Sequence, residues 1–167
     1  MFRVLALNPP FLPRYSRQSR SPSVCKGATF YYPYYLAYAA ANLEKNGFEV
    51  SLVDAVANNW SHEETVQYAV DFNPSLIIID TSTPSIYNDI EVAEKLKSRL
   101  PEVHINLTGT FPTNLTDDCF SFSESVDSVC RSEYEVTVVE LASTIDNGSK
   151  IEEVNGLSFQ IGGIVYH

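Results

Sequence analysis

The feature that most constrains the fold is an apolar run that ends abruptly in hydroxyl side chains, Ser-Leu-Ile-Ile-Ile-Asp-Thr-Ser-Thr-Pro-Ser over residues 75–85. Four consecutive large apolar residues without alternation are typical of a strand covered on both faces, as in the middle of a parallel sheet. Ligands of such open sheets bind beyond the carboxyl ends of the strands, where Thr81, Ser82 and Thr83 follow. The same run equally suits an ordinary strand-to-helix turn with Ser85 or Thr83 as a helix cap.

Strand-like and helical segments alternate along most of the chain. The expected strands cover residues 3–8, 48–53, 76–80, 103–107 and 126–130, and the expected helices cover residues 34–45, 61–71, 85–99 and 133–145. The second helix opens with Ser61 and Glu64 at the spacing of a capping box. This alternation predicts an α/β fold, a doubly wound flavodoxin-like parallel sheet of five strands in the order 2-1-3-4-5.

The C-terminal residues depart from this alternation of strands and helices. Residues 157–161, the pair Gly162-Gly163 and residues 164–166 have the pattern of a two-residue β-hairpin. The chain length favours one domain. We therefore expect an α/β domain over residues 1–150 and a hairpin linker over residues 151–167, leading towards a domain that this chain lacks.

Charge is distributed unevenly along the chain. Residues 1–43 hold five basic residues and no acidic one, whereas the whole chain has a formal charge of -10, which argues against generic nucleic-acid binding. Most of the basic residues lie in an expected long loop over residues 11–33, and loops of this length are usually functional or disordered. This basic loop either receives an anionic ligand or lies against the acidic body. Its basic residues are Arg14, Arg17, Arg20 and Lys26.

The cysteine spacing and the hydropathy of the chain indicate the cellular compartment of the protein. Cys25, Cys119 and Cys130 are an odd number at wide spacing, which fits neither a disulfide framework nor a metal site of the Cys-x-x-Cys kind. We expect plain thiols in a reducing cytoplasm. No apolar run approaches the roughly 20 residues of a membrane-spanning helix.

The turn after the first strand excludes several ligand classes. It reads Asn8-Pro9-Pro10, without the glycines of a dinucleotide site or the Ser/Thr/Gly phosphate loop of a flavin mononucleotide site. A phosphoacceptor receiver domain would use Asp80 and Thr108. Such a domain also needs an acidic pair after the first strand and a lysine after the fifth, where this chain has Asn8 and Arg131. A receiver-like or protein-interaction module is therefore an alternative that these residues leave open.

Segments in order along nearly the whole chain resemble the N-terminal cobalamin-binding domain of cobalamin-dependent radical S-adenosylmethionine enzymes. The closest branch contains proteins that are similar to the anaerobic magnesium-protoporphyrin monomethyl ester oxidative cyclase. The segments that carry the resemblance are residues 8–10, 14–20, 31–40, 43–50, 53–55, 81–85, 109–113, 126–135 and 154–159.

This resemblance implies a cobalamin cofactor at the carboxyl ends of the strands. The tyrosines at 31, 32, 34, 35 and 38 either cover the corrin or pack in the core. The residues that it implies in cofactor binding are Asn8, Pro9, Pro10, Thr81, Ser82, Thr83, Thr108, Gly109, Thr110, Phe111, Arg131, Ser132 and Glu133.

Three departures from the family qualify this expectation. The Asp-x-His-x-x-Gly motif that ligates cobalt in carriers of the methionine-synthase type is missing after the first strand, so we expect no protein histidine ligand, and His62, His104 and His167 are surface or packing residues. The family's Gly-Gly pair after the fourth strand reads Thr108-Gly109-Thr110 here, so a larger side chain stands where the nucleotide tail should pass. The family's Arg-Gly-Glu-Gly-Glu motif is also changed at residues 131–135, where Ser132 and Tyr134 replace its two glycines.

The chain contains no Cys-x-x-x-Cys-x-x-Cys motif, which holds the four-iron cluster in the catalytic barrel of the family. The cluster and S-adenosylmethionine are therefore expected only in a missing barrel, which would be an intramolecular partner in the full-length protein. The parent enzyme would be an oxidoreductase, a cyclase or a methyltransferase, and this fragment alone would not be catalytic. The basic loop would close over the open edge of the site or dock on the barrel.

Overall fold

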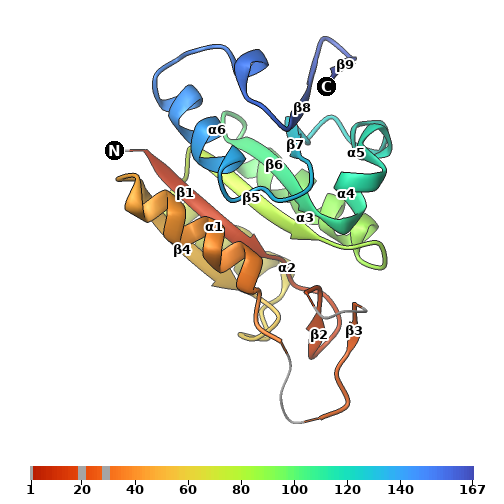
Figure 1. The fold of residues 1–167 in the computed structure, drawn as a ribbon. Coiled ribbons are helices and arrows are strands. Elements are labelled where there is room, and N and C mark those ends of the chain that lie inside the picture. The colour runs from red at the N-terminus through yellow and green to blue at the C-terminus, as the bar shows by residue number, and fades with distance from the viewer. Residues whose placement is uncertain (1, 19–21, 28–30) are drawn as a thin grey trace.

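The computed structural model describes residues 2–18, 22–27 and 31–167. Five parallel strands form the centre of one sheet, and two antiparallel strands extend it (Figure 1). In spatial order the strands are β4 (Glu49–Asp54), β1 (Arg3–Asn8), β5 (Leu76–Thr81), β6 (His104–Gly109), β7 (Ser128–Cys130), β8 (Leu157–Ile161) and β9 (Ile164–Tyr166). Numbered as the sequence predicts them, the parallel strands stand in the order 2-1-3-4-5, which confirms the flavodoxin-like topology.

Helices cover both faces of the sheet. The helices are α1 (Tyr34–Lys45), α2 (His62–Phe72), α3 (Ile86–Arg99), α4 (Thr110–Asn114), α5 (Thr116–Phe122), α6 (Thr137–Asp146) and the 3-10 turn η1 (Ile151–Glu153). One face packs against α1 and α6, and the opposite face packs against α2 and α3, with the side chain of Phe120 from α5 in the same cluster. The predicted capping box is present at the start of α2, where the Ser61 hydroxyl accepts from the backbone of Glu64.

The strand β5 owes its central place to its composition. All of its residues are buried. Because successive side chains of a strand point to opposite faces, Ile77 and Ile79 enter the cluster under α2 and α3 while Leu76 and Ile78 enter the cluster under α1. A strand with one polar face could not serve both layers.

The predicted hairpin is present, and it belongs to the sheet. The strand β8 pairs antiparallel with β7 along Cys130 and Leu157, and β9 pairs antiparallel with β8. That residues 151–167 lead towards a further domain stays a prediction. The expected basic loop carries a small ribbon of its own, in which β2 (Tyr15–Ser16) pairs with β3 (Ser23–Val24).

The two central strands end in very close contact at Gly109. This residue has a φ of 114°, and a Cβ atom added to it would lie 2.1 Å from the carbonyl oxygen of Thr81. Only glycine combines this backbone conformation with that approach. The close approach of β5 and β6 at the carboxyl edge of the sheet therefore requires a residue without a side chain at position 109.

Alanine at a positive φ destabilises a protein even where there is space for its Cβ atom. We expect Gly109→Ala to lower the free energy of unfolding by about 1–3 kcal/mol beyond that loss, because the backbones of β5 and β6 must separate. Gly148→Ala is the control, since Gly148 also has a positive φ (65°) and has no heavy atom within 4 Å of an added Cβ. Urea denaturation of both variants measures the difference, and equal losses would contradict the close-contact explanation.

Candidate functional site

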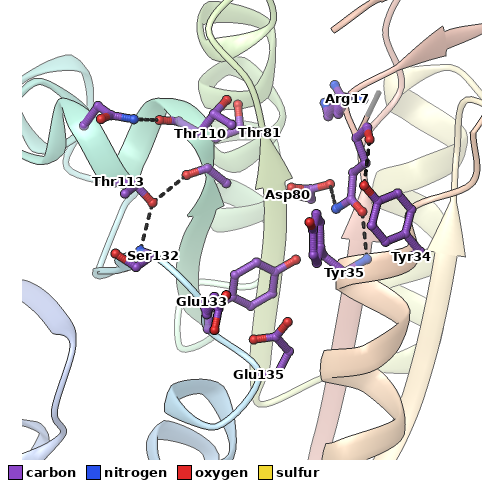
Figure 2. A pocket seen from close by; sticks show the side chains of 14 residues that line it. Arg17, Tyr34, Tyr35, Asp80, Thr81, Thr110, Thr113, Ser132, Glu133 and Glu135 are labelled. Carbon is purple, nitrogen blue, oxygen red and sulfur yellow. Dashed lines mark hydrogen bonds between the residues drawn. The ribbon is translucent and has the colours of Figure 1, made fainter. Parts of the chain in front are cut away.

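A pocket of about 400 Å³ lies at the carboxyl edge of the sheet, a size that suits part of a large cofactor (Figure 2). It is bounded by the start of α1, the ends of β5 and β6, the start of α4 and the connection from β7 to α6. The lining residues are Arg17, Gln18, Tyr34, Tyr35, Asp80, Thr81, Gly109, Thr110, Thr113, Asn114, Ser132, Glu133, Tyr134 and Glu135.

The structure brings five of the residues implied in cofactor binding together in this pocket. They are Thr81, Gly109, Thr110, Ser132 and Glu133. The Thr113 hydroxyl links two walls, because it donates to the carbonyl oxygen of Gly109 (2.8 Å) and accepts from the backbone N–H of Ser132 (3.0 Å).

The other eight lie outside the lining. Thr83 is exposed on the turn after β5, Phe111 is in the core, and Thr108 is fully buried in β6. Arg131 is half-buried, and its backbone N–H donates to the carbonyl oxygen of Gly156. The remaining four, Asn8, Pro9, Pro10 and Ser82, belong to a polar network beside the pocket.

Gln18 closes one wall of the pocket. Its Nε2 donates to Oδ2 of Asp80 (2.6 Å), and its Oε1 accepts from the backbone N–H of Tyr35 (2.7 Å) in the first turn of α1. The Tyr34 hydroxyl donates to the carbonyl oxygen of Gln18 (3.2 Å). One glutamine therefore joins the basic loop, the end of β5 and the start of α1.

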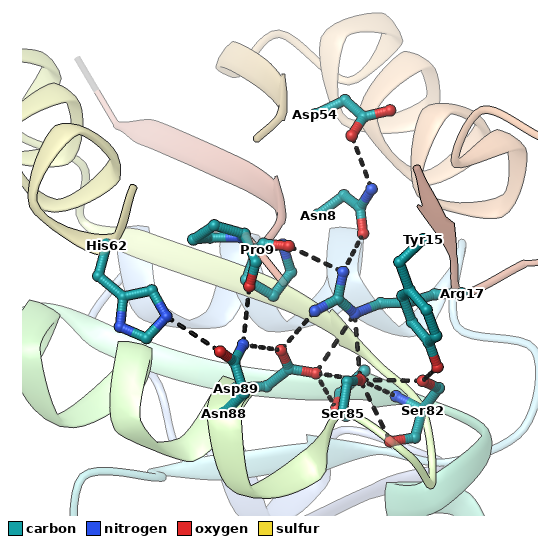
Figure 3. Close-up of polar contacts among 12 residues, drawn as sticks. Asn8, Pro9, Tyr15, Arg17, Asp54, His62, Ser82, Ser85, Asn88 and Asp89 are labelled. Carbon is teal, nitrogen blue, oxygen red and sulfur yellow. Dashed lines mark hydrogen bonds and ion pairs between the residues drawn. The ribbon is translucent and has the colours of Figure 1, made fainter. Parts of the chain in front are cut away.

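Arg17 anchors that loop from inside the protein (Figure 3). Its Nη1 donates to Oδ1 of Asn8 (2.9 Å) and to the carbonyl oxygen of Pro9 (2.8 Å), and its Nη2 pairs with Oδ1 of Asp89 (2.6 Å) on α3. The two side chains of this ion pair are 1% and 0% exposed. Of the two options for the basic loop, Arg17 therefore follows the second, because its charge is paired with an acidic residue of the body. That the loop docks on a barrel stays a prediction.

The Asp89 carboxylate collects further donors. It accepts from the hydroxyls of Ser85 (2.6 Å) and Thr81, and from Nδ2 of Asn88 (3.0 Å). A buried carboxylate with this many donors needs no ligand to balance it. The hydroxyl run after β5 thus serves the network of Arg17 and Asp89, and Thr81 also lines the pocket.

Asp80 is the buried acid of the pocket. It is 2% exposed, and burial raises its pKa to about 7, although the nearby Arg17 guanidinium and the hydrogen bond from Gln18 lower it. The nearby Asp89 carboxylate raises it further. Near neutral pH, Asp80 is therefore present in both protonation states.

Several buried polar atoms around the pocket have no hydrogen-bond partner among the described residues. The Tyr134 hydroxyl is one, and burial followed by the nearby Asp80 raises the pKa of this group. The Thr108 hydroxyl is another; Thr108 pairs with Asp80 in the register of β6 and β5, so both side chains point to the same face. Unpaired buried polar groups are uncommon and call for an explanation.

The pocket is rich in acceptors. Asp80, Glu133 and Glu135 bring carboxyl groups, while Arg17, the one basic side chain among the described residues of the lining, is paired with Asp89. This balance favours ligand groups that donate hydrogen bonds.

Sequence reasoning missed several lining residues. Tyr134 and Glu135 lie within the segment 126–135 that carries the resemblance, but they were not among the residues implied in cofactor binding. Asp80 was considered only as a phosphoacceptor. Gln18 carries no signal of its own, because it reaches the pocket through the fold of the basic loop.

None of the histidines lies in the lining of this pocket. Nε2 of His62 contacts Oδ1 of Asn88 (3.0 Å), Nε2 of His104 contacts the Ser128 hydroxyl (2.7 Å), and Nδ1 of His167 contacts the Ser158 hydroxyl (3.0 Å). Burial lowers the pKa of His104 to about 4. Within the described residues no group of three or more His, Cys, Asp or Glu side chains is arranged to hold a metal ion.

We expect Arg17→Met to lower the free energy of unfolding by about 3–5 kcal/mol, because it leaves the Asp89 charge buried and unpaired. Arg14→Met, in the same loop but exposed, should change stability little. The double variant Arg17→Met with Asp89→Leu should recover part of the loss. Urea denaturation measures all three, and equal losses at positions 14 and 17 would contradict the anchoring role.

The raised pKa of Asp80 predicts a pH dependence of stability. The folded state holds the proton of Asp80 more tightly than the unfolded state does, so protonation of Asp80 raises the free energy of unfolding. This stabilisation is fully present below about pH 4 and is lost as the pH rises through about 7. The free energy of unfolding then falls by at most about 1.4 kcal/mol per pH unit. Asp80→Asn should flatten the stability profile between pH 5 and 8, whereas the exposed control Asp146→Asn should not. A profile unchanged by Asp80→Asn would show that this carboxyl does not titrate there.

Comparison with known proteins gives relatives over most of the chain. The anaerobic magnesium-protoporphyrin IX monomethyl ester cyclase of Synechocystis sp. is 28% identical over 160 residues, which are 95% of this chain and 30% of the relative. An uncharacterized methyltransferase of Pyrococcus horikoshii is 25% identical over 133 residues, which are 80% of this chain and 29% of the relative. The chain thus spans less than a third of the length of these relatives.

Solved structures share the fold. The radical S-adenosylmethionine methyltransferase TsrM from Kitasatospora setae, with cobalamin and a [4Fe-4S] cluster bound, superposes with a TM-score of 0.74 at 15% identity, over 98% of this chain and 29% of that one. The cobalamin-dependent S-adenosylmethionine radical enzyme OxsB, with aqua-cobalamin and S-adenosylmethionine bound, gives 0.71 at 19% identity, over 80% of this chain and 19% of that one.

A family model described as the B12 binding domain matches residues 24–142. The match extends from the basic loop to α6 and includes every residue of the pocket lining except Arg17 and Gln18. The matched segment carries the parallel strands β4 to β7 and most of the pocket at their carboxyl edge, and this chain belongs to the B12 binding domain family.

Proposed function

We propose that this domain holds cobalamin at the carboxyl edge of its sheet, with the nucleotide arm in the pocket, and that it serves a radical S-adenosylmethionine enzyme whose barrel lies outside this chain. The observation that carries the proposal is the pocket with its buried Tyr134 hydroxyl, which has no partner in the described part of the chain and which a bound ligand would satisfy. When bound, cobalamin would supply cobalt chemistry to a reacting centre in that barrel.

The chain's own residues would bind and orient this cofactor. Gly109 lets the backbone ends of β5 and β6 form the floor of the pocket without a side chain. Gln18 and the start of α1 form one wall, and Ser132 and Glu133 form the opposite wall. The parent would be an oxidoreductase, a cyclase or a methyltransferase, with its four-iron cluster and S-adenosylmethionine in the barrel. The curated relatives include a cyclase and a methyltransferase.

We place the protein in the cytoplasm, which its three free cysteines support. Within the part of the chain that the structure describes, no helix is long and apolar enough to cross a membrane.

The first test is binding. Purified protein mixed with hydroxocobalamin and desalted should elute with corrin absorbance, and Thr110→Trp should reduce the bound fraction at least about tenfold by filling the pocket. Thr144→Trp is the matched control, because Thr144 lies near the far end of α6. Corrin that never co-elutes, together with phosphorylation of Asp80 by a small phosphodonor, would support the receiver-like alternative. The burial of Asp80 and its bond to Gln18 argue against that alternative.

The second test concerns cobalt ligation. We expect no protein imidazole on the lower face of the corrin, because no histidine lies within residues 8–33 or in the pocket lining. Electron paramagnetic resonance of the cob(II)inamide complex, which has no nucleotide base, should show cobalt hyperfine lines without nitrogen splitting. Triplets that disappear in His62→Ala or His104→Ala would show histidine ligation and overturn this expectation.

A further inference from the structure

The pocket already holds an amide group, which belongs to the protein itself. The side chain of Gln18 bridges two elements there, because its Nε2 donates to Oδ2 of Asp80 (2.6 Å) and its Oε1 accepts from the backbone N–H of Tyr35 (2.7 Å) (Figure 2). Asp80 belongs to β5, and Tyr35 belongs to the first turn of α1. An acceptor and a donor therefore face each other at the spacing that one carboxamide spans.

Both partners of this amide depend on it. Pro33, at the start of α1, makes no side-chain capping bond, so the Oε1 atom of Gln18 serves a helix N–H group that would otherwise be open. Asp80 is 2% exposed, and among the described residues its carboxyl accepts a side-chain hydrogen bond only from Gln18. A pocket without this glutamine would therefore present an open donor and an open acceptor to a ligand.

The backbone of Gln18 is held independently of its side chain. Its carbonyl oxygen accepts from the Tyr34 hydroxyl (3.2 Å), and the preceding Arg17 is anchored by the buried ion pair with Asp89. The Gln18 residue itself is partly exposed. The side chain can therefore turn out of the pocket while the loop stays in place.

A third group shows that Gln18 does not complete this site. Tyr134 lines the pocket and is 5% exposed, yet its hydroxyl has no partner among the described residues. Burial and then Asp80 raise the pKa of this hydroxyl and Gln18 lowers it, so both groups lie close to it. A ligand that takes the place of the Gln18 amide and also pairs with Tyr134 satisfies more buried polar atoms than the glutamine does.

Corrinoids carry the group that fits. Their ring bears primary carboxamides around its edge, and the nucleotide arm is joined to the ring through a further amide. Each of these groups offers an N–H donor beside a carbonyl acceptor, as Gln18 does. A carboxylate or a phosphate has no N–H group to donate, and it would bring negative charge close to Glu133 and Glu135 in the same lining.

We propose that Asp80 and the N-terminus of α1 form a subsite for an amide group of the corrinoid, which Gln18 fills in the ligand-free protein and from which the ligand displaces it. The inference rests on the proposed function, because it requires that a corrinoid enters this pocket. Gln18 is then an internal competitor of the cofactor. When only a fraction of the protein is open to a ligand, its apparent affinity falls by that fraction.

The first measurement is the Kd of cobalamin, obtained by equilibrium dialysis with corrin absorbance. Gln18→Ala should bind cobalamin at least about fivefold tighter than the unchanged protein, because the competitor is gone. Gln67→Ala is the matched control and should keep the Kd, since the Gln67 amide also donates to a carboxylate, that of Asp71 (2.8 Å), but lies on α2 away from the pocket. Thermal unfolding checks that both variants fold.

Cobyric acid identifies which amide of the ligand enters the subsite. It keeps the primary carboxamides of the ring but has a carboxylate where the nucleotide arm is joined. If Gln18→Ala binds both ligands more tightly, a ring carboxamide fills the subsite. If the variant binds only cobalamin more tightly, the amide of the arm fills it. Either result supports the inference.

Nuclear magnetic resonance observes the displacement in the unchanged protein. The side-chain amide signal of Gln18, identified by its loss in Gln18→Ala, should move to the position of an exposed amide when cobalamin binds, while the signal of Gln67 should stay. A Gln18 signal that stays in place with cobalamin bound would overturn the inference, whether or not the variant folds.

The outcomes separate this inference from the proposed function. If neither corrinoid binds to the protein or to Gln18→Ala, the proposed function fails. If cobalamin binds but Gln18→Ala has an equal or weaker affinity for it, the domain still holds corrinoids and the glutamine is not a competitor.

Discussion

The buried ion pair between Arg17 and Asp89 is the interaction on which the site depends most. It joins the basic loop to α3, and through Asn8 and Pro9 it also holds the end of β1. Charges buried to this degree are stable only when they are paired and hydrogen-bonded, and this pair has the hydroxyls of Thr81 and Ser85 around it. Gln18 follows Arg17 directly, so the anchored arginine places the glutamine that closes the pocket.

The end of β5 and the hydroxyl-rich turn after it contribute residues both to the hydrogen-bond network of Arg17 and Asp89 and to the pocket. Ser82 and Ser85 serve the side of α3, where their polar atoms are satisfied within the protein. Asp80 points to the opposite face, where the hydroxyls of Thr108 and Tyr134 have no partner among the residues that the structure describes. A protein seldom leaves such atoms buried without reason, so the unpaired side is where a ligand is expected. Whether buried polar atoms have hydrogen-bond partners therefore indicates the binding side of the sheet better than the residue types do.

The fold separates some of the residues implied in cofactor binding from neighbours that line the pocket. Thr108 and Gly109 are adjacent, yet the Thr108 side chain is fully buried outside the lining while Gly109 lines the pocket. Likewise Asn8, Pro9 and Pro10 lie at the right edge of the sheet but bind Arg17 and Asn88 instead of lining the pocket.

The sequence by itself determined the parallel sheet, its strand order and the terminal hairpin, because hydrophobic periodicity and ordered turns are local properties. The resemblance carried by its ordered segments indicated the family. It also indicated the three connections at the carboxyl edge from which most lining residues come. Only the tertiary structure decided that Arg17 is buried, that Gln18 closes a wall, and that Tyr134 and Thr108 carry unpaired hydroxyls. Those facts depend on contacts between residues far apart in the chain, such as Arg17 and Asp89, and no local pattern encodes which partner a side chain will meet.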